Sequence, residues 1–119
     1  MPWVKLEQNR SLGVFADELS AKLNRQVQYI GDPSKSISTV AWCTGAAQSY
    51  MEQAITNGVD VFISGEISEE TVHLARESNT AYISAGHHAT ERYGIKALGE
   101  HLAEKFDLHH QFIDIDNPI

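Results

Sequence analysis

Residues 86–92 (GHHATER) are the part of this chain best suited to chemistry, because two adjacent histidines precede a glutamate. His87 and Glu91 are four residues apart, so on a helix their side chains share one face, roughly 5–6 Å apart at Cβ. An imidazole and a carboxylate at this separation can ligate one metal ion or bracket two. His88 lies at the opposite edge of the same helical arc, so helix geometry alone does not choose between the two histidines. A glutamate held by backbone amides at a helix start, beside a packed histidine, is the alternative, since two ligands do not close a metal site.

The flanking sequence predicts where this segment sits. The apolar run at 80–84 is typical of a buried strand, Gly86 allows a turn, and an amphipathic helix then extends to about Phe106. This order places the histidines at the carboxyl end of a strand, which is the usual ligand-binding edge of an open α/β sheet. Glu91 also shares an arc of roughly 80° with the apolar positions of the helix, so we expect it on the core-facing side. Those positions are Ile95, Leu98, Leu102 and Phe106.

The rest of the chain predicts a single α/β domain over residues 1–119. Hydrophobic patterning indicates strands at 27–30, 37–43, 59–64 and 80–84, with an edge strand at 111–115. Helices are expected from the Ser11 cap to Leu23, from about 45 to the stop at Gly58, and after the Ser68 cap. Because strand and helix alternate from Ile37 onward, we predict a mostly parallel sheet of about five strands with helices packed on it.

Glu66 and His73 are weaker candidates. Glu66 follows the 59–64 strand, where a carboxylate could act as a general base or hold another side chain of the site. An acidic residue just before a helix is an equally good interpretation. His73 lies inside the next helix and, taken alone, is typical of a packed or half-exposed histidine.

Composition excludes several classes of protein. The net charge of −7 argues against binding to nucleic-acid polymers and to anionic membranes. Cys43 is the single cysteine, which excludes an internal disulfide and a thiolate zinc cluster. No apolar run approaches the roughly 18 residues of a membrane span, and the first residues lack signal-peptide character. We therefore expect a cytoplasmic protein.

Four stretches resemble, in order, one family: the GTP cyclohydrolase I type 2 homolog family, also called NIF-three-like, in its shorter bacterial form. They are AWCTGAAQ at 41–48, SGEISEETVHLARE at 64–77, GHHATERYGIKALGEHL at 86–102 and FIDIDNP at 112–118. The resemblance covers nearly all of this chain but only about the second half of a family member. It implies that the chain is a C-terminal fragment or a separately expressed domain.

The resemblance also implies a site. Family members are similar to two-domain α/β proteins that form toroidal homohexamers with a dinuclear metal site between the domains. A His-His pair and an aspartate come from the first half, and a histidine and a glutamate come from the second. Matched residue by residue, the last two are His87 and Glu91, so His88 becomes a neighbour of the site. Glu66 and His73 fall where the family often has an acidic residue and a histidine near the metals.

The function that this implies is metal-dependent hydrolysis by the intact protein, with two divalent ions (zinc, iron or manganese) activating a bridging water. Glu66 is then the candidate catalytic base, and the family name implies a purine nucleotide as the small-molecule substrate. Because three ligands have no counterpart here, we expect this chain alone to bind metal weakly or not at all and to be inactive. The alternative is a non-catalytic metal-binding or assembly module of the toroidal oligomer.

Overall fold

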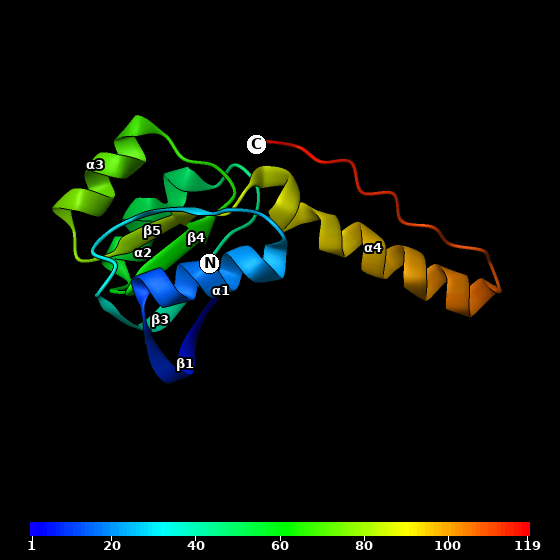
Figure 1. Ribbon diagram of the computed structural model, residues 1–119, viewed down its shortest axis with the longest axis horizontal. Coiled ribbons are helices and arrows are strands. Elements are labelled where there is room, and N and C mark those ends of the chain that lie inside the picture. Colours follow the sequence, from blue (N-terminus) through cyan, green and yellow to red (C-terminus); the bar gives the residue numbers. More distant parts are fainter.

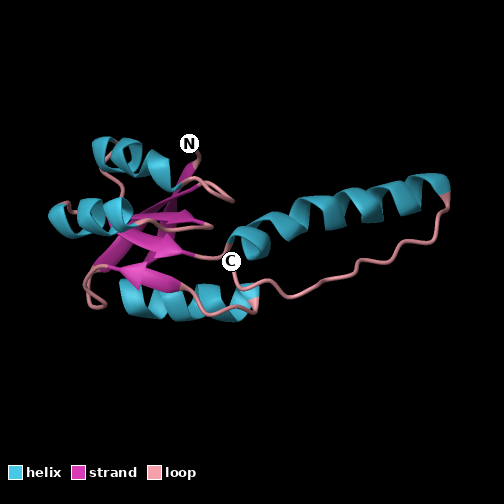
Figure 2. Ribbon diagram, turned by 90° about the horizontal axis from the view of Figure 1, so that it is seen from above, coloured by secondary structure: helices cyan, strands magenta, loops and turns pink.

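A computed structural model describes the whole chain, residues 1–119. The protein is an α/β structure in which helices cover both faces of one five-stranded sheet (Figures 1 and 2). In chain order the elements are β1 (Trp3–Ser11), α1 (Leu12–Leu23), β2 (Gln28–Ile30), β3 (Ser36–Trp42), the 3-10 helix η1 (Gln48–Tyr50), α2 (Met51–Thr56), β4 (Val61–Ser64), α3 (Glu69–Glu77), β5 (Ala81–Ser84) and α4 (His87–Phe106). No helix combines the length and the hydropathy needed to cross a bilayer.

The sheet is mixed, with strand order β1-β3-β4-β5-β2. The three central strands, β3, β4 and β5, are parallel, whereas β1 pairs antiparallel with β3 and β2 pairs antiparallel with β5. The predicted α/β class is confirmed, the number of strands agrees although one of the five is a different segment, and "mostly parallel" holds for the centre of the sheet only. The reason is that alternation of strands and helices predicts parallel pairing only for strands that a helix connects in succession. The two edge strands, β1 and β2, come before the alternating run in the sequence, so their direction was not predicted.

The central strands bury side chains on both faces, because successive residues of a strand point to opposite sides. Val40, Val61 and Ile83 belong to the core under α1. Phe62 and Tyr82 belong to the other core, under α2 and α3, with ring centroids 5.7 Å apart in an edge-to-face arrangement. These two cores fix the strand ends that carry the candidate site.

The predicted helix caps are confirmed. The Ser11 hydroxyl accepts a hydrogen bond from the amide of Val14 at 3.4 Å, and the Ser68 hydroxyl accepts one from Thr71 at 3.3 Å. Gly58, the predicted stop, follows α2 with φ +65°. The helix expected from about 45 is shorter than predicted, since its first part is the 3-10 turn η1.

Strand β1 was not predicted, and the strand predicted at 111–115 is wrong. Most of β1 is exposed, and its pairing with β3 is irregular between Lys5 and Arg10, so its sequence lacks the alternation that marks a strand. Residues 108–119, here called the C-terminal segment, are extended but form no strand. An alternating pattern becomes a strand only where a neighbouring backbone is present to bond with it.

The prediction that the apolar stripe of α4 faces the core is also wrong. Helix α4 projects away from the sheet, and the C-terminal segment runs back along it toward the body (Figure 1). Ile95 and Phe106 are 62% and 57% exposed, and Ala89 is the only buried residue of the helix. Amphipathic spacing shows that a helix has an apolar face but not which surface covers it.

Candidate metal-ligand site

Three loops meet at the carboxyl edge of the parallel strands and position the candidate residues. The loop after β4 lies in the middle, since the Gly65 amide donates to the Gly45 carbonyl and the Gly86 amide donates to the Gly65 carbonyl, each at 2.9 Å. These bonds continue the order of β3, β4 and β5 beyond the sheet. They bring the first turn of α4 against the loop that follows β3, as the position of the GHHATER segment predicts.

Two glycines allow this close approach. Gly45 has φ +68°, and a Cβ built on it would lie 2.4 Å from Glu91 Oε1 and 3.2 Å from His87 Nε2. A Cβ on Gly65 would lie 2.7 Å from His87 Cα. A side chain at either position would therefore occupy the space that the candidate ligands now use.

The Gly45 loop is held by polar side chains from both of its neighbours. The hydroxyl of Ser64, which is fully buried, donates to the Gly45 carbonyl at 3.0 Å and accepts from the Ala47 amide at 3.1 Å. On the opposite side, Thr90 Oγ1 accepts from the Gly45 amide at 3.2 Å. Because two of these bonds join the loop to β4 and the third joins it to α4, the loop cannot shift without breaking contacts to β4 or to α4.

His87 lies between two carboxylates. Its Nδ1 is 2.6 Å from Glu66 Oε1, and its Nε2 is 3.0 Å from Glu91 Oε2. The hydrogen bond to Glu66 raises the pKa of His87 above its ordinary value, burial opposes this rise, and the charge of Glu91 adds to it. The imidazolium form of His87 can donate to both carboxylates, so a metal ion at Nε2 would compete with a proton.

The donor types fit a metal centre, but this chain does not complete one. An imidazole nitrogen and a carboxylate converge at one point, and Glu66 holds the other ring nitrogen in the way that carboxylates orient metal-binding histidines. No group of three or more His, Cys, Asp or Glu side chains in the structure could hold a metal ion. The chain therefore offers two converging donors, whereas a stable site needs at least three.

Glu66 contacts His87 directly, which the sequence did not show. The backbone carbonyl of Glu66 accepts a hydrogen bond from the buried Tyr82 hydroxyl, so the residue is held from the sheet side as well. The second candidate neighbour, His73, is elsewhere. It lies on α3 with its side chain 61% exposed, 3.8 Å from Glu69, and no contact joins it to His87 or Glu91.

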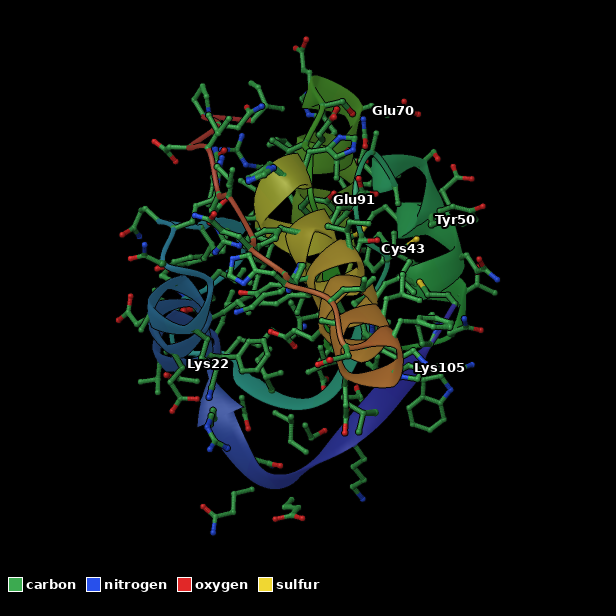
Figure 3. All side chains as sticks on the ribbon, turned by 90° about the vertical axis from the view of Figure 1, so that its right-hand side faces the viewer. Lys22, Cys43, Tyr50, Glu70, Glu91 and Lys105 are labelled. Atoms are coloured by element: carbon green, nitrogen blue, oxygen red, sulfur yellow. The ribbon has the colours of Figure 1, made fainter.

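His88 turns away from Glu91 and contacts the C-terminal segment. Its Nε2 is 2.7 Å from Asp114 Oδ1, and Arg92 donates to Asp114 Oδ2 at 2.9 Å. Sequence reasoning missed Arg92 and Asp114 as neighbours of the site, although both lie in stretches, GHHATER and FIDIDNP, that carry the family resemblance. Figure 3 looks along α4 and shows Glu91 at the end of the helix that joins the body.

Comparison with known proteins identifies the family of this chain. The model of the Duf34/NIF3 (NGG1p interacting factor 3) family matches residues 2–118. The chain belongs to this family. It is 53% identical over 117 residues to a GTP cyclohydrolase 1 type 2 homolog of Allochromatium vinosum, covering 98% of this chain and 46% of the relative. It is 46% identical over 119 residues to the Escherichia coli protein of the same name, covering 99% of this chain and 48% of the relative.

The fold agrees with a solved family structure. The chain superposes on protein ybgI, described as of unknown function, with a TM-score of 0.93 and 47% identity, covering 99% of this chain and 48% of that one. The family expected from the four motifs is thus confirmed. The chain spans about half the length of the curated relatives it matches.

Proposed function

We propose that His87 and Glu91 are two ligands of a divalent metal centre, and that an intact protein of this family uses that centre as a metal-dependent hydrolase. The observation that carries the proposal is the position of His87, whose Nε2 meets Glu91 at 3.0 Å while Glu66 holds its Nδ1 at 2.6 Å. The remaining ligands, and a second metal ion, would come from the part of the relatives that this chain does not span.

Each residue has a definite role in this proposal. A bound divalent ion, for which zinc, iron and manganese are all suitable, lowers the pKa of a coordinated water and so supplies a nucleophile near neutral pH. His87 and Glu91 would hold the ion, and Glu66 accepts a hydrogen bond from the Nδ1–H group of His87, which fixes the ring and leaves Nε2 for the ion. Since its carboxylate is engaged in this way, Glu66 is proposed first as an orienting residue and only second as the base.

Manganese titration of the chain, followed by paramagnetic broadening in its NMR spectrum, tests the ligands. Two donors should bind Mn²⁺ weakly, with a dissociation constant on the order of 1 mM, about −4 kcal/mol. Broadening should centre on residues 45, 66 and 87–91, and both His87→Ala and Glu91→Gln should abolish it there. The chain contains a matched control, because Glu69 and His73 are also four residues apart on a helix but lie 3.8 Å apart and exposed.

His73→Ala and Glu69→Gln should leave the broadening at His87 unchanged. Broadening spread evenly over the acidic surface, or unchanged by Glu91→Gln, would contradict the ligand assignment. For the hydrolase itself, a family member of full length should lose activity on chelation and in the variant matching Glu91→Gln. Retained activity in both cases would leave the metal site without a catalytic role.

A second candidate function is assembly, favoured by the apolar stripe of α4. Leu98 is 51% and Leu102 is 39% exposed, next to Ile95 and Phe106, so the stripe forms an apolar surface open to water, as interaction sites often do. A chain with this surface should associate with copies of itself. Sedimentation velocity over a range of concentrations measures this, and Leu98→Lys should move the population toward the monomer.

A further inference from the structure

A cavity of about 600 Å³ lies beside the candidate ligands, between α4 and the C-terminal segment. Its size is within the range of small-molecule sites. The helix forms one wall and the C-terminal segment forms the other. The lining residues are His87, His88, Glu91, Arg92 and Ile95 from α4, and Phe112, Ile113, Asn117 and Ile119 from the C-terminal segment.

The C-terminal wall is held in place although it forms no strand. Asp114 accepts from Arg92 and pairs with His88, as described above, and this cluster of His88, Arg92 and Asp114 is here called the latch. The Arg25 guanidinium donates to the carbonyls of Asn117 and Pro118 at 3.0 and 2.8 Å. Because the wall is tied to α4 through Asp114 and to the loop after α1 through Arg25, the cavity is a built feature of the fold.

The latch also uses the charges that could bind an anion in the cavity. Arg92 is engaged with Asp114 and with the carbonyl of Leu23, and His88 is engaged with the other oxygen of Asp114. The side-chain oxygen of Asn117 accepts from the Ile119 amide at 3.0 Å. Lys96 is not among the lining residues and stands 6.0 Å from the centroid of the Phe112 ring. The lining therefore provides no cation that is free to bind a phosphate group.

What remains for a ligand is a polar end and an apolar end. His87 and Glu91 form the polar end, where carboxylate charge would repel an anion unless a metal ion is present. Ile95, Phe112 and Ile113 form the apolar end, and an aromatic ring against them would be removed from water.

We propose that this cavity is a ligand-binding site continuous with His87 and Glu91, and that it accepts an uncharged apolar or aromatic group of the ligand rather than a phosphate chain. What the polar end binds rests on the proposed metal function, whereas the binding of an apolar group at the other end does not depend on it. The substrate class that follows is a small molecule with a metal-binding oxygen and a planar apolar body. A nucleoside triphosphate, which the relatives' name suggests, would have to be held by the metal ions alone, because the side chains of this lining leave no cation free for its phosphate chain.

The first test uses the metal-free, isotope-labelled chain and two probes, benzamide and inorganic triphosphate. Benzamide should give saturable shifts of the backbone amides at 112–119 and 88–95, whereas triphosphate should give none there. Removing the ring by Phe112→Ser should weaken benzamide binding by about tenfold, the order expected when an aromatic side chain leaves an apolar contact. Phe106→Ser is the matched control, because Phe106 is 57% exposed near the far end of α4 and does not line the cavity.

The second test addresses the latch. Asp114→Asn should release the C-terminal wall and weaken benzamide binding, whereas Asp116→Asn, at an exposed residue with no hydrogen bond or ion pair, should not. Saturable triphosphate shifts at Arg92 and Ile113 would overturn the proposal. Benzamide binding that is unaffected by Phe112→Ser would overturn it equally.

Adding Mn²⁺ to the benzamide complex separates this proposal from the proposed function. If both hold, the metal ion should broaden the ring protons of bound benzamide, and removing the ion with a chelator should remove that broadening while the amide shifts remain. Benzamide binding without any specific Mn²⁺ effect would leave the cavity in place and contradict the assignment of His87 and Glu91 as ligands. Specific Mn²⁺ binding without benzamide binding would support His87 and Glu91 as ligands and overturn the proposed ligand-binding cavity.

Discussion

The body of this protein, residues 1–86, and its arm, residues 87–119, treat similar apolar patterns in opposite ways. In the body, side chains from both faces of the sheet are buried beneath α1, α2 and α3. In the arm, Ala89 is the only buried residue, and the apolar stripe of α4 is open to solvent. The candidate ligands lie where the two regions join. The difference teaches that the buried core that stabilises the fold lies in the body, whereas the arm leaves its candidate ligands and its apolar surface partly exposed.

The largest expected effect comes from the same substitution made in each region. Phe62→Ala removes a fully buried ring and its contact with Tyr82, and should lower the free energy of unfolding by about 3–5 kcal/mol. Phe106→Ala removes a ring that is 57% exposed and should change it by less than about 0.5 kcal/mol. Urea denaturation measures both.

If Phe62→Ala does not fold, Phe62→Leu provides a milder comparison, with a smaller but still clear loss. Similar losses for the two alanine variants would show that the arm is packed against the body in solution, and the contrast between the regions would then fail.

A smaller effect is expected from two aspartates, one in each region. Asp60 Oδ2 accepts four hydrogen bonds of 2.7–2.9 Å from the amides and hydroxyls of Ser38 and Thr39, which join β4 to β3. Burial raises the pKa of Asp60, but these hydrogen bonds together outweigh it and leave the pKa below its ordinary value. A carboxyl group whose folded-state pKa is lowered stabilises the protein above its unfolded pKa of about 3.9, and this contribution is lost as the pH falls through the folded value.

Asp60→Ala should therefore cost about 1–3 kcal/mol of unfolding free energy at pH 7. The difference from wild type should shrink below about pH 4. Asp114→Ala, in the arm, should release the C-terminal segment without lowering the stability of the sheet. Unfolding curves from pH 3 to 7 measure the first effect, and hydrogen exchange of amides 112–119 measures the second. If the loss of unfolding free energy in Asp60→Ala does not depend on pH, the charge of Asp60 does not contribute to the hydrogen bonds that join it to Ser38 and Thr39.

The smallest effect on stability should come from Leu98→Lys, which places a charge at the middle of the stripe on α4. Because Leu98 is half exposed, the free energy of unfolding should change by less than about 0.5 kcal/mol. Thermal unfolding at low concentration checks this, alongside the sedimentation experiment above. A large loss of stability in a protein that remains monomeric at all concentrations would mean that the stripe packs within the chain.

Much of the body could be predicted because its signals are local. Ser11 and Ser68 cap their helices through hydroxyl contacts three residues away, and Gly58 stops α2 with a positive φ. The alternation of strands and helices from Ile37 onward predicts a mostly parallel sheet, and this holds for β3, β4 and β5. Strand β1 was missed because it is an exposed edge strand whose register is irregular, so hydrophobic periodicity has little to report there.

The arm shows where such signals stop. The pattern at 111–115 has the alternation of a strand and α4 has the spacing of a core helix, yet neither finds its partner within this chain. Both predictions failed for one physical reason: periodicity describes a surface, whereas burial and strand pairing depend on a second surface.

By itself, the sequence determined the family and the α/β class, and the resemblance to that family, not helix spacing, selected His87 with Glu91 as the candidate pair. These conclusions depend on residue types and on their order along the chain. Only the tertiary structure decided that Glu66, which is 21 residues before His87, holds its Nδ1, and that His88 and Arg92 are committed to Asp114. Contacts of this kind depend on which strand ends lie side by side and on where a free segment returns to the body. No local pattern encodes either, so the role of each charge around GHHATER became visible only in the folded chain.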